Sequence, residues 1–171
     1  MDLNKTVQYL LFPGIIIHEF SHAFACVCLG IKIKKIKWVS AEGGFVIHEA
    51  SRSHATIIIS LFPFVFNLLF AFSMGLLLKI SNNQLLSIIL IWLGISAIFF
   101  SVPSVQDAKN VFAAIKESYT KKQSIWKWLY KIILLPLTVI VLVLSWIFKM
   151  LDESFIFRLI LIVVWLSVFI V

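Results

Sequence analysis

The chain has 171 residues, of which 61% are hydrophobic and 13% charged, and its formal net charge is +7. A soluble domain is about half apolar and about a quarter charged, so the composition excludes an ordinary soluble protein. The basic residues flank long apolar runs and accompany no nucleic-acid-binding motif, which excludes DNA or RNA as a partner. The composition predicts an integral membrane protein whose surroundings are the lipid bilayer.

The first apolar run predicts a helix over residues 13–29. Pro13 suits the first turn of a helix, and Gly30 suits the position just after its end. Seventeen residues give about 25 Å of helix, close to the thickness of the hydrocarbon core. In the segment 31–49, residues 31–38 alternate apolar and basic side chains with a slip at Lys35, Gly43-Gly44 supplies a turn, and residues 45–47 form a return strand. This pattern predicts a small β-hairpin at the membrane surface, with the slip as a bulge.

The rest of the chain predicts four more spans and one amphipathic helix. The spans are expected over residues 55–78, 85–100, 128–148 and 155–171. Ser104 is expected to cap the amphipathic helix, whose apolar face would hold Val105, Ala108, Val111, Phe112 and Ile115. The predicted fold class is therefore an all-α polytopic membrane protein of about five transmembrane helices, with one hairpin after the first. It forms one domain over residues 1–171, with a core at 10–115 and two additional helices at 125–171.

Lysine residues predict how the chain is oriented. They concentrate in two loops, residues 31–54 and 104–131, whereas the other side of the membrane receives few basic residues. Five spans place both loops on one side, and loops rich in Lys and Arg face the cytoplasm. We therefore expect cytoplasmic loops, an outside N-terminus and a location in a prokaryotic cytoplasmic membrane.

The segment His18-Glu19-Phe20-Ser21-His22 is the strongest chemical signal in the chain. Histidines four residues apart on a helix project from one face and can bind one Zn²⁺. The intervening Glu19 is too far around the helix to bind easily, but it can take a proton from a zinc-activated water. Ionisable side chains inside an apolar span are costly unless they are compensated, which favours a metal site over histidines that only form hydrogen bonds within the bundle.

A catalytic zinc site needs a third protein ligand, and several residues compete for that role. Asp107 is one candidate, because a carboxylate together with Glu19 would neutralise Zn²⁺. Ser104 and Asp107 also have the spacing of a helix capping box, which explains the aspartate without a metal. The other candidates are His48, His54, Glu49 and Glu42. Residue chemistry alone leaves the choice between Asp107 and the two histidines open.

Pro63 and Asn67 lie together in the second predicted span. Pro63 has no N–H for the carbonyl near Ile59, and a nearby polar side chain can satisfy such a freed group. Asn67 has two interpretations: its amide contacts substrate or an oxyanion beside the zinc ion, or it joins helices by hydrogen bonding.

Together these motifs resemble the site-2 protease family of intramembrane zinc proteases. The resemblance covers residues 10–115 and depends on the HExxH segment with Pro13-Gly14 before it, on Pro63 with Asn67, and on Pro103 with Asp107. It implies that His18, His22 and Asp107 are zinc ligands, that Glu19 is the catalytic base and that Asn67 is catalytic. Ser101 and Ala108 depart from the family pattern, which has Asn and Gly at these places.

The expected function is hydrolysis, by a zinc metalloprotease, of a peptide bond in or near the bilayer of a membrane-embedded protein or peptide. Water must reach such a site through a polar cleft on the cytoplasmic side. The hairpin is expected either to pair with an unwound substrate strand or to lie on anionic headgroups as a plain cationic flap. The alternative function is that of a non-catalytic zinc-binding membrane protein, such as a degenerate protease homologue or a partner subunit.

Overall fold

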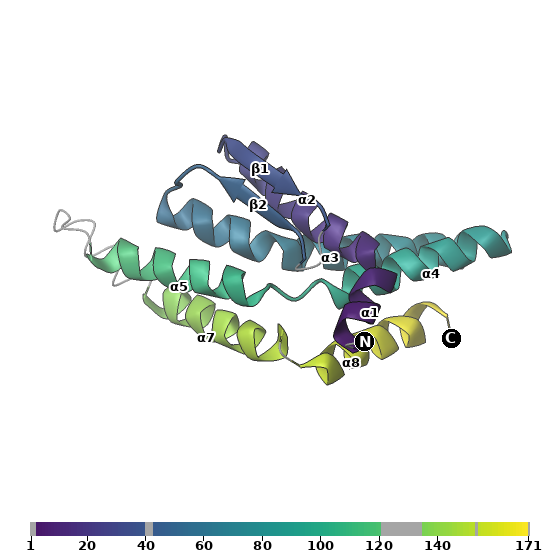
Figure 1. The fold of residues 1–171 in the computed structure, drawn as a ribbon. Coiled ribbons are helices and arrows are strands. Elements are labelled where there is room, and N and C mark those ends of the chain that lie inside the picture. The colour runs from purple at the N-terminus through teal and green to yellow at the C-terminus, as the bar shows by residue number, and fades with distance from the viewer. Residues whose placement is uncertain (1–2, 40–42, 121–134, 153, 171) are drawn as a thin grey trace.

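The chain folds into packed helices with one small hairpin (Figure 1). The structure is a computed structural model that describes residues 3–39, 43–120, 135–152 and 154–170. The helices are α1 (Leu3–Leu10), α2 (Phe12–Cys28), α3 (Ser53–Ile80), α4 (Gln84–Phe99), α5 (Val105–Thr120), α7 (Leu135–Asp152) and α8 (Phe155–Phe169), and the strands are β1 (Ile33–Lys37) and β2 (Phe45–His48). The mostly helical fold with a hairpin after the first apolar helix is confirmed.

Among the described residues, α3 is the one helix whose length and composition suffice to cross a membrane. It has 28 residues, whereas α2, α4 and α8 are apolar but have 17, 16 and 15. The expectation of five spans therefore stays a prediction. Residues 121–134, which include Lys121, Lys122 and the start of the predicted fourth span, lie outside the described residues.

Helices α2, α3 and α4 pack against one another and form the core around the HExxH segment. Gly14 lets α2 and α4 approach closely, because a Cβ at this position would collide with the carbonyl oxygen of Ser96. Helix α8 packs against α3 and α4, and the Trp165 indole N–H donates to the Ala71 carbonyl at 3.0 Å. The predicted additional C-terminal helix is thus joined to the core by a buried hydrogen bond.

The hairpin begins immediately after α2. Gly30, at φ +66°, ends the helix, and its N–H donates to the Val27 carbonyl at 3.0 Å while the Ile31 N–H donates to the Cys26 carbonyl at 2.8 Å. These two bonds form a Schellman motif, which confirms Gly30 as the helix stop. Strands β1 and β2 are antiparallel, with a shift of register between Ile33 and Lys35. The predicted slip is therefore confirmed as an irregularity of the ladder.

A short link after α4 carries the chain back toward α2. Ser101, Val102 and Pro103 in this link are buried, so it runs through the protein and not over its surface. Helix α5 then lies along α3 and α7 (Figure 1). Its predicted apolar face is confirmed: Ala108, Val111 and Ile115 are buried, and Val105 and Phe112 are partly buried. The inward course of the link places the first turn of α5 opposite the middle of α2.

Candidate metal centre

His18 and His22 lie one turn apart on α2 and are both buried. Their rings face each other edge to face, with centroids 4.9 Å apart and planes at 76°. The spacing of four residues alone puts both imidazoles on one side of the helix. The packing of α3, α4 and α5 around that side then buries them.

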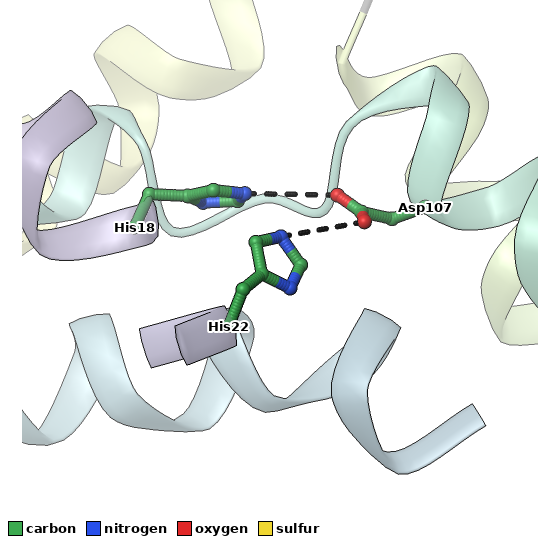
Figure 2. A group of neighbouring side chains, drawn as sticks. All are labelled: His18, His22 and Asp107. Carbon is green, nitrogen blue, oxygen red and sulfur yellow. Dashed lines mark ion pairs between the residues drawn. The ribbon is translucent and has the colours of Figure 1, made fainter. Parts of the chain in front are cut away.

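Asp107, in the first turn of α5, faces both imidazoles (Figure 2). Its Oδ1 lies 3.4 Å from Nε2 of His22, and its Oδ2 lies 3.6 Å from Nε2 of His18. One ligand atom from each of the three residues lies within 4.8 Å of the other two. The structure therefore gathers two imidazoles and one carboxylate into a group that could hold a metal ion.

The orientation of His18 depends on the last carbonyl of α4. His18 Nδ1 lies 2.8 Å from the carbonyl oxygen of Phe100, the residue that caps this helix. Carbonyls in the last turn of a helix have no partner within the helix, so this one is available to a side chain. The Asn67 amide donates to the same oxygen at 2.8 Å. The Phe100 carbonyl at the end of α4 therefore contacts one side chain from α2 and one from α3. It meets the His18 ring at Nδ1, whereas Nε2 faces Asp107.

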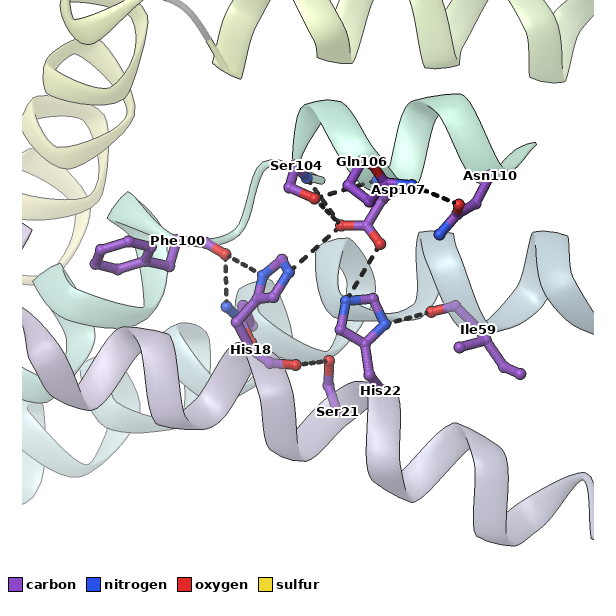
Figure 3. A network of polar contacts seen from close by, with 10 residues as sticks. His18, Ser21, His22, Ile59, Phe100, Ser104, Gln106, Asp107 and Asn110 are labelled. Carbon is purple, nitrogen blue, oxygen red and sulfur yellow. Dashed lines mark hydrogen bonds and ion pairs between the residues drawn. The ribbon is translucent and has the colours of Figure 1, made fainter. Parts of the chain in front are cut away.

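The orientation of His22 depends on a carbonyl in the middle of α3. His22 Nδ1 lies 2.9 Å from the carbonyl oxygen of Ile59. In a regular helix this oxygen would accept from the N–H of residue 63, but residue 63 is proline and has no N–H. The freed carbonyl that the sequence predicts is thus satisfied by His22 and not by Asn67 (Figure 3).

The hydrogen-bonding pattern of the two rings suits a divalent cation. A carbonyl oxygen only accepts, so each Nδ1 carries its proton, and Nε2 of a neutral ring presents a lone pair to Asp107. An N–H donating to a carboxylate is expected at about 2.7–2.9 Å, shorter than the 3.4 and 3.6 Å found here. Two ligands of a tetrahedral zinc ion, each bound at about 2.0–2.2 Å, lie about 3.3–3.6 Å apart. The donor set therefore fits zinc.

Asp107 is at the same time a helix cap. The Ser104 N–H and Oγ both donate to its Oδ2, at 2.9 and 2.6 Å, and the Asp107 N–H donates back to Ser104 Oγ at 3.1 Å. The capping box and the ligand role, which the sequence presents as alternatives, are therefore compatible. Oδ2 is occupied by Ser104, which leaves Oδ1 with the more open lone pairs for a metal.

The charge state of Asp107 agrees with a ligand role. Without a metal ion, burial by itself would raise the pKa of this carboxyl, but attraction to protonated His22 and hydrogen bonds from both imidazoles more than offset burial, so the pKa lies well below its ordinary value; a bound zinc ion would take the place of those protons. A metal-binding carboxyl must be ionised. Asp107 meets that condition in its present surroundings.

Glu19 and the three clustered residues open into one cavity of about 430 Å³. The cavity is also lined by the second strand of the hairpin and by the first turns of α5. Gly44 lies directly against Glu19, because a Cβ on this glycine would collide with Glu19 Cγ and stand 2.8 Å from the Trp38 carbonyl oxygen. The hairpin therefore covers the side of the cavity on which the predicted base lies.

Comparison with known proteins bears on the first third of the chain. Residues 3–61 match the Peptidase M50B-like family. Over these residues the chain is M50B-like. No curated protein and no solved structure matches the chain significantly. M50 peptidases are zinc peptidases and are typically membrane proteins, which agrees with the donor set described above.

The M50B-like segment holds the HExxH residues, the hairpin and the start of α3, but it ends before Asn67 and Asp107. The geometry alone brings Asp107 to the two histidines. The departures from the site-2 protease pattern have local roles: the Ser101 hydroxyl donates to the Ile98 carbonyl at 2.8 Å, and Ala108 lies on the buried face of α5.

The other candidate ligands do not belong to the cluster of His18, His22 and Asp107. His48 lines the cavity, but its Nδ1 lies 2.7 Å from the Glu49 carbonyl oxygen, and neither it nor the exposed His54 and Glu49 belongs to the group of clustered ligand atoms. Glu42 lies outside the described residues. Asn67 is fully buried and is not among the residues that line the cavity. Its amide is directed at Phe100, behind the site.

Two features of the site were not predicted from the sequence. One is the Phe100 carbonyl, which no sequence pattern marks, although helix ends always leave carbonyls unpaired. The other is Asn110, which lines the cavity one turn after Asp107 on α5. Asn110 follows the expected ligand Asp107 by three residues, and this spacing puts both side chains on one face of a helix. The sequence could therefore have indicated Asn110.

Proposed function

We propose that this chain is a zinc-dependent intramembrane endopeptidase, which hydrolyses a peptide bond in or near the bilayer of a membrane-embedded protein or peptide. One observation carries the proposal: the facing nitrogens of His18 and His22 and the Asp107 carboxylate stand at zinc-ligand separations in a cavity that also contains Glu19. The M50B-like match over residues 3–61 supports it.

The roles of the residues follow from their positions. His18, His22 and Asp107 would hold the zinc ion, with Nδ1 of each imidazole bonded to a carbonyl that fixes the ring. When bound, zinc supplies a Lewis acid, which polarises a carbonyl and lowers the pKa of water toward about 7. The carboxylates of Asp107 and Glu19 together carry two negative charges, which neutralise a divalent cation in this buried place.

Glu19 moves the proton in the proposed reaction. Its carboxylate takes a proton from the attacking water as the water oxygen bonds to the scissile carbonyl carbon. As the C–N bond breaks, Glu19 returns that proton to the departing nitrogen, so the base ends the cycle unprotonated. A site with only a structural or binding role would have no need of a carboxylate at this point of the cavity. The intact Glu19 therefore favours an enzyme over a non-catalytic zinc-binding protein.

The site is proposed to lie within a cytoplasmic membrane, reached from the side of the Lys-rich loops 31–54 and 104–131. Helix α3 is long enough to span the bilayer, and α2, which carries the histidines, packs against it. The hairpin, which follows α2 and covers Glu19, lies where a locally unwound substrate strand would enter. Its position supports pairing with such a strand, and its lysines suit anionic headgroups.

Zinc content and cleavage, measured together, test this function. We would purify the wild type in detergent under zinc-replete conditions and measure bound zinc. Cleavage would be followed in proteoliposomes with single-span peptides of about 20 apolar residues, which carry helix-weakening Gly or Asn at different depths. The variants are Glu19→Gln, His22→Ala and Asp107→Ala.

We expect one zinc ion per chain in the wild type and in Glu19→Gln, with cleavage lost in Glu19→Gln. His22→Ala and Asp107→Ala should lose most of the zinc. Stoichiometric zinc without cleavage of any peptide in the panel would favour the non-catalytic alternative. A metal-free wild type would contradict both functions, and full zinc in Asp107→Ala would reassign the third ligand.

A further inference from the structure

Peptide hydrolysis at this site requires a hydrogen-bond donor aimed at the substrate carbonyl oxygen, in addition to the metal. Negative charge develops on that oxygen as water adds to the carbon, and a fixed donor within about 2.7–3.1 Å stabilises it. The sequence suggests Asn67 for this role. The structure directs the Asn67 amide at the Phe100 carbonyl and gives it no place in the cavity wall.

Asn110 occupies the position that the role requires. It lines the cavity, and it follows Asp107 by three residues on α5, so the two Cβ atoms are neighbours at about 5–6 Å. A substrate carbonyl placed beside the Asp107 carboxylate would therefore lie within reach of the Asn110 carboxamide.

The carboxamide of Asn110 is held in one orientation. Gln106, one turn earlier, donates from Nε2 to Asn110 Oδ1 at 2.9 Å. Figure 3 shows the Asn110 oxygen turned to Gln106 and its nitrogen turned to the side on which His22 and the Ile59 carbonyl lie. The structure assigns that nitrogen no partner among the described residues, so its N–H groups remain available to a ligand in the cavity.

Other polar groups of the cavity wall suit the role less well. Ser104 is bonded to Asp107 through both its N–H and its hydroxyl. Ser60 is buried in the wall, but its hydroxyl rotates and is not fixed toward one point. The Arg158 guanidinium is placed over aromatic rings at the end of α4, with its Cζ 4.8 Å from the centroid of the Phe99 ring and 5.9 Å from that of Phe100.

We propose that Asn110 is a second catalytic residue, whose carboxamide N–H donates to the carbonyl oxygen of the scissile peptide bond, and that Gln106 is the positioning residue that fixes this amide. The proposal rests on the peptidase function proposed above and adds to it the donor for the developing oxyanion.

The test compares Asn110→Leu, which keeps similar bulk without a donor, with Asn110→Asp, which keeps the shape and replaces the donor by an acceptor. Both should retain zinc and thermal stability, while kcat falls about 10²-fold or more and KM changes little, because an oxyanion donor acts in the transition state. A peptide phosphonamidate, which mimics the tetrahedral state, should lose affinity by a similar factor in both variants.

Gln106→Leu tests the positioning role. We expect about a 10-fold loss of kcat, because the Asn110 N–H remains but can turn away. In the double variant Asn110→Leu with Gln106→Leu, kcat should be no lower than in Asn110→Leu alone, since the effects of two residues that act through one hydrogen bond are not additive. Lys109→Gln, an exposed neighbour on α5 that does not line the cavity, is the control and should behave as the wild type.

Three results would overturn the proposal. If Asn110→Leu and Asn110→Asp keep wild-type kcat and phosphonamidate affinity while Glu19→Gln is inactive, Asn110 is not the donor and the peptidase function stands. Loss of zinc in Asn110→Leu would show that Asn110 supports Asp107 instead of contacting substrate. A wild type that neither holds zinc nor cleaves would remove the peptidase function, and the role of Asn110 with it.

Discussion

Pro63 frees the carbonyl that orients His22. The missing N–H of the proline leaves the Ile59 oxygen without its helical partner, and His22 Nδ1 lies 2.9 Å from it. The second imidazole follows the same rule, because His18 Nδ1 lies 2.8 Å from the Phe100 carbonyl at the end of α4. Both rings are thus turned toward Asp107 by backbone acceptors that helix geometry leaves unpaired. Such partners fix the ring nitrogen that faces a metal.

Pro63→Ala should weaken zinc binding, although the substitution favours the helix. Alanine restores the N–H at residue 63, which competes with His22 for the Ile59 carbonyl. Loss of a partner that orients a metal-binding histidine typically costs about 10- to 100-fold in metal affinity. We expect a decrease in that range, measured by competition with a zinc chelator.

Pro13→Ala is the matched control for this substitution. Pro13 lies in the first turn of α2, where an N–H has no helical partner in any case. Zinc affinity should stay at the wild-type value. Unchanged affinity in Pro63→Ala as well would show that the Ile59 contact does not orient His22.

Asn67→Leu separates a positioning role from direct contact with substrate. The amide bonds the Phe100 oxygen beside His18, while its own Oδ1 is buried with no hydrogen-bond partner among the described residues. Leucine removes one hydrogen bond and one unpaired oxygen together, so the free energy of unfolding should change by no more than about 1 kcal/mol. Zinc affinity should fall about 10-fold, and kcat at saturating zinc should change little. A large loss of kcat with unchanged zinc affinity would show instead that Asn67 contacts the substrate.

Ser104→Ala should affect both roles of Asp107. The change removes the hydroxyl that caps α5 and holds Oδ2, which typically costs about 1 kcal/mol of stability. Oδ2 then keeps only its bond from the residue 104 N–H, so Asp107 is held less firmly and zinc affinity should also fall, by about 10-fold. Thermal unfolding and chelator competition measure the two effects. The control is Ser101→Ala: the Ser101 hydroxyl donates to the Ile98 carbonyl and not to Asp107, so zinc affinity should stay unchanged. Equal effects of both variants would speak against the dual role of Asp107.

Gly44→Ala should reduce cleavage without loss of zinc. The added methyl collides with Glu19 and approaches the Trp38 carbonyl, so either the hairpin or the glutamate must move. Overpacking of this kind typically costs about 1–3 kcal/mol, and we expect kcat/KM to fall about 10-fold or more. Lys35→Gln, an exposed change on the same hairpin, should leave the zinc content as it is. Full activity in Gly44→Ala would show that the hairpin is not held against the base.

Local patterns in the chain were enough to predict much of the fold. The histidine spacing places both rings on one face of α2, Gly30 ends that helix, and the slip near Lys35 appears as a shift in the ladder between Ile33 and Lys35. Each of these features depends on residues within about one helical turn or one strand. The backbone periods of helix and strand are constant, so short-range spacing translates directly into structure.

Contacts between distant segments were decided by the tertiary structure alone. The choice of Asp107 over His48 and His54 depends on how the buried link after α4 turns inward, and Asn67 bonds Phe100, the residue that also holds His18. Asn67 and Phe100 are 33 residues apart in the chain, and His18 and Asp107 are 89 apart. Spacing along the chain does not predict whether residues this far apart are in contact, because such contacts depend on the packing of whole helices. The sequence by itself therefore determined that two imidazoles and a glutamate share one helix, and only the packing decided which carboxylate and which carbonyls complete their surroundings.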